Sequence, residues 1–212
     1  MQHLDNIKKI FSKDFVEHPL IETYEAGKIN LPSGKLVACD PLITADMKPF
    51  TVNFPIGEFL VYVHKERESG CIAYVEIVFA TKPAVNWEMA LTEGQRLKDL
   101  DKNEVFGYPV ESGMGCFMDV ETQAALNKLE ADLYEKKGDD FQGIYEEFFH
   151  MHFFHSKGAQ DQYAFLKPQN NVDGTIFAFE AGYGEGFYAS YIGFDEEGNV
   201  VKIITEFIEI TN

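Results

Sequence analysis

The chain has 212 residues, of which 45% are hydrophobic and 14% aromatic, a composition that excludes a disordered chain and suffices for a hydrophobic core. Its formal charge is −17, from 35 acidic and 18 basic residues. This balance argues against binding to nucleic acid or to an anionic membrane, which requires clustered Lys and Arg, and permits a basic protein partner or a cation.

Cysteine usage and the first residues favour a cytoplasmic location. Cys39, Cys71 and Cys116 are odd in number, far apart and without a Cys-x-x-Cys pair, so we expect neither a disulfide framework nor a structural zinc site. The opening segment lacks the unbroken apolar core of a signal peptide, and no apolar run is long enough to span a bilayer.

The first half of the chain predicts one helix and several strands. Apolar residues at near-helical spacing predict a short amphipathic helix within residues 4–15. Residues 21–42 predict two extended segments around a Pro-Ser-Gly turn. The runs 58–66 and 71–80, rich in Val, Ile, Phe and Tyr, predict a hairpin. Residues 82–95 are expected to be irregular, with at most a turn or two of helix.

Two helices are predicted in the middle of the chain. Residues 120–136 carry a stripe of leucines, and residues 140–155 repeat aromatic side chains with the helical period. Asp119 is placed to cap the first helix, a contribution of about 1 kcal/mol.

Strands return in the last third of the chain, over 174–181, 186–194 and 199–209. No regular βαβ alternation and no flexible linker is present. We therefore predict an α+β fold with a largely antiparallel sheet and a helix pair inserted between the N-terminal and C-terminal strands. We expect one domain over residues 1–212, with residues 119–157 as its helical segment.

The stretch VESGMGCFMD, residues 110–119, is the first candidate for a functional site. It could be a nucleophile loop, a binding loop or a strand-to-helix junction. Ser112 lacks the Gly-x-Ser-x-Gly pattern of a nucleophile turn. Cys116 lies three residues before the predicted helix, whose dipole would lower its thiol pKa, or it is a small hydrophobe entering the core. Gly113 and Gly115 allow positive φ, so we favour a shaped junction whose backbone meets a ligand.

The second candidate is the glycine-rich loop AGYGEG, residues 181–186. It leads into an aromatic strand rather than a helix, and Glu185 would repel a phosphate, so we exclude a nucleotide site. Glu111 and Glu185 are expected on the same side of the sheet, beside Asp40, as the rim of a cleft. The candidate ligand-binding residues are Asp40, Trp87, Glu111, Ser112, Gly113, Gly115, Tyr183 and Glu185.

Trp87 and the histidines are weaker candidates. Trp87 is most simply a partly buried core residue, but Glu88 beside it becomes of interest if the indole lines a pocket. His150, His152 and His155 leave at most two imidazoles on one helix face, so we expect no metal there, and no cofactor.

Three blocks of the sequence resemble a known family. They are SGKLVACDPL, ESGMGCFMD and GYGEGFYASYIGFDEEGNVVKIITEF, and the Trp-Glu of NWEMA also fits. Together they resemble the uncharacterised, mainly bacterial family called domain of unknown function 4241. In that family the third block more often reads Gly-Asp-Gly where this chain has Gly184-Glu185-Gly186. The resemblance implies no established activity.

The sequence leaves two functional classes open. The first is a binding module whose glycine-rich loops form an acidic cleft for a basic protein partner or a small ligand. The alternative is a small hydrolase-like enzyme that uses a carboxylate cluster or Cys116, with Glu111 and Asp119 as further catalytic candidates. We favour the first, because no complete catalytic constellation is present.

Overall fold

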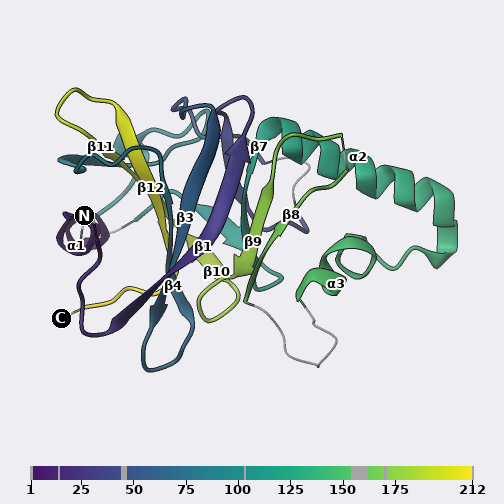
Figure 1. Ribbon diagram of the computed structural model, residues 1–212, viewed down its shortest axis with the longest axis horizontal. Coiled ribbons are helices and arrows are strands. Elements are labelled where there is room, and N and C mark those ends of the chain that lie inside the picture. Colours follow the sequence, from purple (N-terminus) through teal and green to yellow (C-terminus); the bar gives the residue numbers. More distant parts are fainter. Residues whose placement is uncertain are drawn as a thin grey trace.

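Two antiparallel β-sheets lie face to face between helices, which gives four layers in the order helix, sheet, sheet, helix (Figure 1). The computed structural model describes residues 2–13, 15–43, 47–102, 104–153, 162–169 and 171–211. Every strand pairing in this part of the chain is antiparallel, so the predicted α+β fold class is confirmed.

The larger sheet has six strands, and its outer face is covered by α1 (Gln2–Ile10). The predicted N-terminal helix is present but ends at Ile10, and Phe15 is 63% exposed. In spatial order the strands are β1 (Ile21–Leu31), β3 (Gly57–Glu66), β4 (Ile72–Val78), β12 (Val200–Glu206), β11 (Ser190–Phe194) and β5 (Asn86–Met89).

The smaller sheet has four strands and packs its phenylalanines against the larger one. Phe117, Phe177 and Phe179 are fully buried in the core between the sheets. A two-stranded ribbon, β6 (Tyr108–Val110) with β10 (Gly186–Tyr188), lies beside this sheet. The four strands are β2 (Leu36–Cys39), β7 (Met114–Asp119), β9 (Ile176–Glu180) and β8 (Tyr163–Leu166), in that order.

A helical arm covers the outer face of the smaller sheet. It consists of α2 (Val120–Lys137), a 3-10 turn (Gly138–Asp140), a π-helical turn (Tyr145–Phe149) and α3 (His150–Phe153). The first predicted helix is confirmed. The second is wrong over residues 141–143, because Gly143 adopts a φ of 98° and interrupts the helix. Its last two residues, 154 and 155, lie outside the described part.

Three strand predictions need correction. Residues 86–89 form β5 rather than an irregular segment, because they pair with β11 at the edge of the larger sheet. The run 186–194 is two strands in different sheets, β10 and β11, which are separated at Ala189. Residues 114–119 form a fully buried central strand, so the segment predicted to be a junction is mostly β7, and only residues 111–113 form a turn.

A buried ionic network crosses the outer face of the larger sheet. Lys202 Nζ lies 2.6 Å from Glu76 Oε1, and His64 Nε2 lies 3.0 Å from Glu76 Oε2. Thr23 Oγ1 lies 2.9 Å from His64 Nδ1. Burial opposes ionisation of Glu76, but His64 and Lys202 outweigh it and hold the pKa of this carboxyl below its usual range. The network therefore links β1, β3, β4 and β12 through side chains.

Asp119 joins the smaller sheet to the helical arm. Its side chain is fully buried and accepts a hydrogen bond from Glu121 N at 3.0 Å, which caps α2 as predicted. It also accepts bonds from Ser33 N (2.9 Å), Ser33 Oγ (2.6 Å) and Gly34 N (3.0 Å). The carboxylate thus fixes both the start of α2 and the turn between β1 and β2.

We expect Asp119→Ala to destabilise the protein by about 3 kcal/mol, well above the roughly 1 kcal/mol of a helix cap alone, because three further donors, one buried and two half-buried, lose their acceptor. Urea unfolding would measure this as a lower midpoint with an unchanged slope. Asp132→Ala is the matched control, since Asp132 lies in the same helix and pairs with Lys128 in solvent. Its effect should stay below about 1 kcal/mol, and equal losses in both variants would contradict the assignment.

Candidate functional site

The two glycine-rich loops meet at one edge of the molecule. The ribbon of β6 and β10 pairs Val110 with Gly186, so the turn at residues 111–113 lies beside the loop at 181–185. Ala181 N donates to Gly113 O at 2.9 Å. A Cβ added to Gly113, whose φ is 79°, would lie 3.7 Å from the Cα of Gly184. The expectation that these loops come together therefore agrees with the structure.

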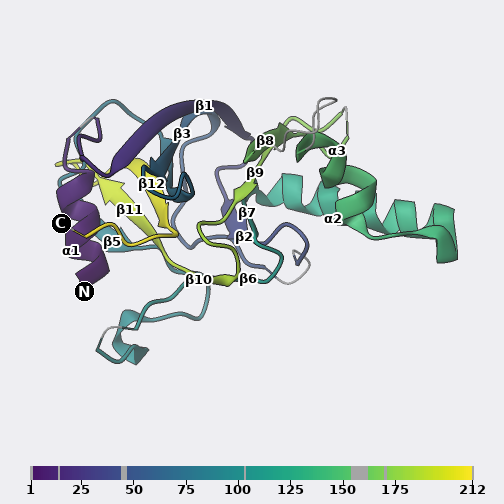
Figure 2. The same ribbon diagram turned by 90° about the horizontal axis from the view of Figure 1, so that it is seen from below.

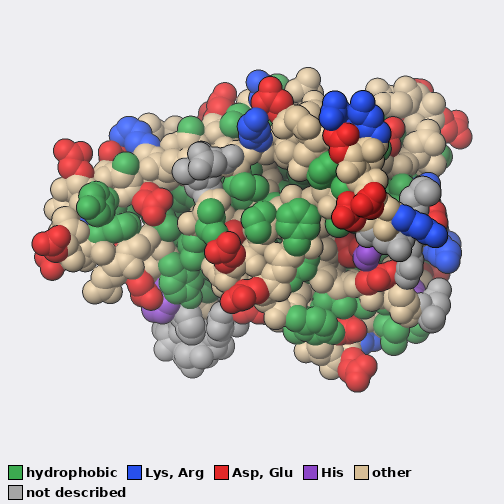
Figure 3. Space-filling model, turned by 180° about the vertical axis from the view of Figure 1, so that it is seen from behind, with side chains coloured by type: hydrophobic (Ala, Val, Ile, Leu, Met, Phe, Trp, Pro, Cys, Tyr) green, Lys and Arg blue, Asp and Glu red, His purple; other side chains and the backbone are tan. Residues whose placement is uncertain are grey.

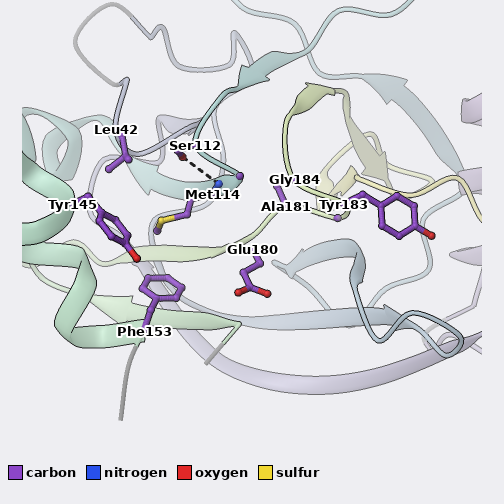
Figure 4. Close-up of a pocket in the computed structure, with 11 residues that line it drawn as sticks. Leu42, Ser112, Met114, Tyr145, Phe153, Glu180, Ala181, Tyr183 and Gly184 are labelled. Carbon is purple, nitrogen blue, oxygen red and sulfur yellow. Dashed lines mark hydrogen bonds between the residues drawn. The ribbon is translucent and has the colours of Figure 1, made fainter. Parts of the chain in front are cut away.

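A cleft of about 510 Å³ opens between these loops and the helical arm (Figure 4). Tyr145 and Phe153 lie on one side of it and the second glycine-rich loop on the other, with Glu180 between them. The cleft is lined by Leu42, Ser112, Gly113, Met114, Tyr145, Phe153, Glu180, Ala181, Gly182, Tyr183 and Gly184.

Asp40 organises the first loop. Its carboxylate is 1% exposed and accepts hydrogen bonds from Leu42 N (2.9 Å), Glu111 N (3.0 Å) and Ser112 N (2.8 Å). Asp40 is not among the residues that line the cleft. Its side chain holds the turn in place, and the turn presents Ser112 and Gly113 to the cleft.

The two glutamates lie at the same end of the ribbon but outside the cleft. Glu111 follows Val110 and Glu185 precedes Gly186, the two residues that pair at that end. Both side chains are exposed. Each is next in sequence to a residue that lines the cleft, and their convergence on one ligand remains a prediction.

Tyr183 and Gly115 have positions that the sequence did not reveal. The Tyr183 side chain is 69% exposed, points away from the cleft and donates to Glu66 Oε2 at 2.7 Å, a bond that raises the pKa of the phenol (Figure 4). Gly115 lies in β7, where a Cβ would come within 2.5 Å of the Phe179 ring. Its role is close packing, and the positive φ expected for it is absent from its strand conformation.

Glu180, Tyr145 and Phe153 were missed by sequence reasoning. Glu180 is the last residue of β9, directly before the glycine-rich loop, and its side chain is half-buried. Its position next to AGYGEG was the available signal. The two aromatic residues showed only the helical period, and nothing in that period indicated which face would meet the cleft.

Cys116 is buried inside the smaller sheet. Its Sγ lies 3.5 Å from the Sγ of Cys39 on the neighbouring strand, and both side chains are fully buried. Burial, followed by the contact with Cys39, raises the pKa of the Cys116 thiol well above its usual range. A substrate has no access to this sulfur, and the thiolate is disfavoured.

Trp87 and the histidines lie away from the glycine-rich loops. Trp87 is on β5 and is 6% exposed. The His150 ring contacts Tyr145, and the His152 ring contacts Phe148, where burial lowers the His152 pKa. His155 lies outside the described residues. Within the described ranges no group of three His, Cys, Asp or Glu side chains could hold a metal, and the absence of a metal site remains a prediction.

The layers and the cleft define an α+β protein of antiparallel sheets, and none of its described helices is both long and apolar enough to cross a membrane. The chain belongs to the family described as Protein of unknown function (DUF4241), whose model matches residues 29–205. This confirms the family resemblance of the sequence. No curated protein and no solved structure matches the chain.

Thiol labelling should separate the three cysteines. Cys71 is half-buried, whereas Cys39 and Cys116 are fully buried. We expect Ellman's reagent to modify Cys71 in the folded protein, and the other two thiols only as the protein unfolds. The Cys71→Ser variant should therefore stay unlabelled until denaturant is added. Rapid labelling of Cys116 in that variant would restore it as a nucleophile candidate.

Asp40→Asn should loosen the turn at residues 111–113, because it removes the charge from an acceptor shared by three backbone N–H groups. We expect amide hydrogen exchange at Glu111 and Ser112 to become about tenfold faster. This factor corresponds to the free energy of one charge-assisted hydrogen bond. Asp99→Asn, which alters an exposed pair with Arg96, is the control. Unchanged exchange at both amides would show that another contact holds the turn.

Proposed function

We propose that this protein is a binding module whose cleft takes a positively charged, planar group, such as the guanidinium of an arginine in a basic protein partner. The observation that carries the proposal is the position of Glu180, a carboxylate between an aromatic pair and a glycine-rich loop. A guanidinium donates to carboxylates in a bidentate manner and stacks on aromatic rings, so it fits both features.

The glycines support this assignment. Residues 181–184 and Gly113 line the cleft, and because three of these five residues are glycines, the backbone there can approach a ligand closely. Tyr145 and Phe153 supply ring surface on the opposite side. The volume of about 510 Å³ is that of a site for one side chain or a small molecule.

Long-range electrostatics favour the same class of ligand. The chain carries a formal charge of −17, and acidic side chains are scattered across the face seen in Figure 3, with hydrophobic side chains in its middle. Such a field speeds the approach of a cation and disfavours an anion. With its cysteines free, we place the protein in the reducing cytoplasm.

No observation favours the hydrolase alternative. Cys116 is buried against Cys39, and both oxygens of Asp119 accept hydrogen bonds from protein groups. Asp40 is likewise occupied by backbone N–H groups. These candidates hold the fold together around the cleft, and a binding role needs none of them as a reacting group.

NMR titration with N-acetyl-arginine amide tests the proposal. We expect saturable shifts at the amides of Ser112, Gly113 and Gly184, and none with N-acetyl-norleucine amide, which lacks the charge. Glu180→Gln should weaken binding about tenfold, because the ligand loses one hydrogen bond between charged groups and its free energy corresponds to that factor.

Glu93→Gln is the matched control, because it removes the same charge from a side chain that is 81% exposed. It should leave the affinity nearly unchanged. Equal weakening by both substitutions, or shifts spread over the acidic surface, would indicate non-specific attraction and contradict the proposal.

A further inference from the structure

A second cavity, of about 500 Å³, lies at the α1 end of the molecule, away from the helical arm. It is lined by the start of α1, by β5, by Tyr191 of β11 and by residues from 97–102 and 104–105, the first of which form a 3-10 turn (Leu97–Asp99). Figure 2 shows α1 and β5 together at one end and α2 and α3 at the other. The cavity therefore shares no wall with the cleft.

The walls of this cavity are mainly apolar. Its volume is in the range of sites that bury most of a small organic molecule. The apolar side chains that line it are Leu4, Trp87, Met89, Leu97, Leu100 and Val105. Such a lining favours a ligand with a hydrocarbon or aromatic body.

Tyr191 supplies a polar group with no partner. It lines the cavity and is fully buried, yet its hydroxyl makes no hydrogen bond with any described residue. Burial, followed by the nearby charges of Glu206 and Glu209, raises the pKa of this phenol, so it stays protonated. Buried hydroxyl groups in proteins are nearly always hydrogen-bonded, so this one calls for a partner from outside the described chain.

A buried carboxylate lies near Tyr191. Glu206 is diagonally across from it on β12, and its side chain interacts with Tyr74. Its Oε2 lies 2.7 Å from His3 Nδ1, and the His3 side chain lines the cavity. Glu206 does not line the cavity itself, but its charge next to the Tyr191 hydroxyl favours a ligand group that donates over one that accepts.

The charges around the cavity select a cation. Glu88, Asp101 and Glu104 line it, against His3 and Lys102. Trp87 adds an aromatic face, to which an ammonium group is attracted. A carboxylate ligand would meet repulsion from Glu206 and from three acidic side chains of the lining.

We propose that this cavity binds a small hydrophobic amine, whose protonated nitrogen donates to the Tyr191 hydroxyl oxygen and whose apolar body packs against Trp87, Met89 and Leu97. The site is independent of the proposed cleft. It gives a function to the Trp87-Glu88 pair, which the glycine-rich loops do not use.

Trp87 is the only tryptophan in the chain, so its fluorescence reports on this cavity directly. Titration with 2-phenylethylamine should change that fluorescence in a saturable way. The neutral 2-phenylethanol should bind about tenfold more weakly, and 3-phenylpropionate more weakly still. An alcohol or carboxylate that binds as tightly as the amine would overturn the proposal, as would the absence of a saturable change.

Tyr191→Phe removes only the hydroxyl and keeps the ring in the core. It should weaken amine binding roughly tenfold and 2-phenylethanol binding less, because the alcohol makes a weaker, uncharged hydrogen bond with the same hydroxyl. Tyr183→Phe, which removes a hydroxyl bonded to Glu66 outside this cavity, is the control and should alter neither affinity. Equal effects of the two variants would overturn the role of Tyr191.

Leu97→Arg provides a test at a position that tolerates change, since Leu97 is 52% exposed. A cation at the rim should reduce amine binding by at least about tenfold. Circular dichroism would verify the fold of this variant. Unaltered amine affinity in the folded variant would place the amine elsewhere. Binding of N-acetyl-arginine amide to the cleft should be unaffected, which separates the two sites.

Discussion

The pairing of β2 with β7 is the constraint on which the rest of the molecule depends, because a buried aspartate closes it at each end. Asp119 pairs with Leu36 at one end, and Asp40 follows the Cys39–Cys116 pair at the other. Each carboxylate accepts hydrogen bonds from backbone N–H groups of a neighbouring turn. The donors lie at residues 33–34 for Asp119 and at residues 111–112 for Asp40. A buried carboxylate without donors is costly, so neither turn can move away independently. The first loop of the cleft therefore takes its position from the same strand pair that starts α2.

The elements that could be predicted from the sequence are those whose determinants are adjacent along the chain. The hairpin of β3 and β4 and the helix α2 have a clear hydrophobic period and their turn or cap residues beside them. β7 was not predicted as a strand, because all six of its residues are buried and no alternation marks it. β5 is a strand because β11 pairs with it, and that partner is remote in sequence.

The same distinction applies to the candidate site. Glycines mark loops, and both glycine-rich loops were predicted from the sequence to form one site. The pairing of β6 with β10 brings these loops together. The functions of side chains could not be predicted in this way. Asp40 and Asp119 are acidic residues at strand ends, but their oxygens are occupied by backbone donors, a fact that depends on which turns fold against them. Tyr145 and Phe153 reach the cleft because the chain turns back where α2 ends at Gly138, and no local pattern specified the direction of that turn (Figure 1).

The second cavity depends on a different set of buried charges. Replacing a buried ionic network with apolar residues is often neutral for stability, so the value of His64, Glu76 and Lys202 lies more in fixing one arrangement of strands. That arrangement extends to α1, because the Phe11 ring packs edge-on against His64 and Tyr74 at 5.1 and 5.3 Å. The position of α1 in turn places His3 and Leu4 in the wall of the cavity. Buried aspartates of the smaller sheet thus shape the cleft, and a buried triad of the larger sheet shapes the cavity, so each site can vary without the other.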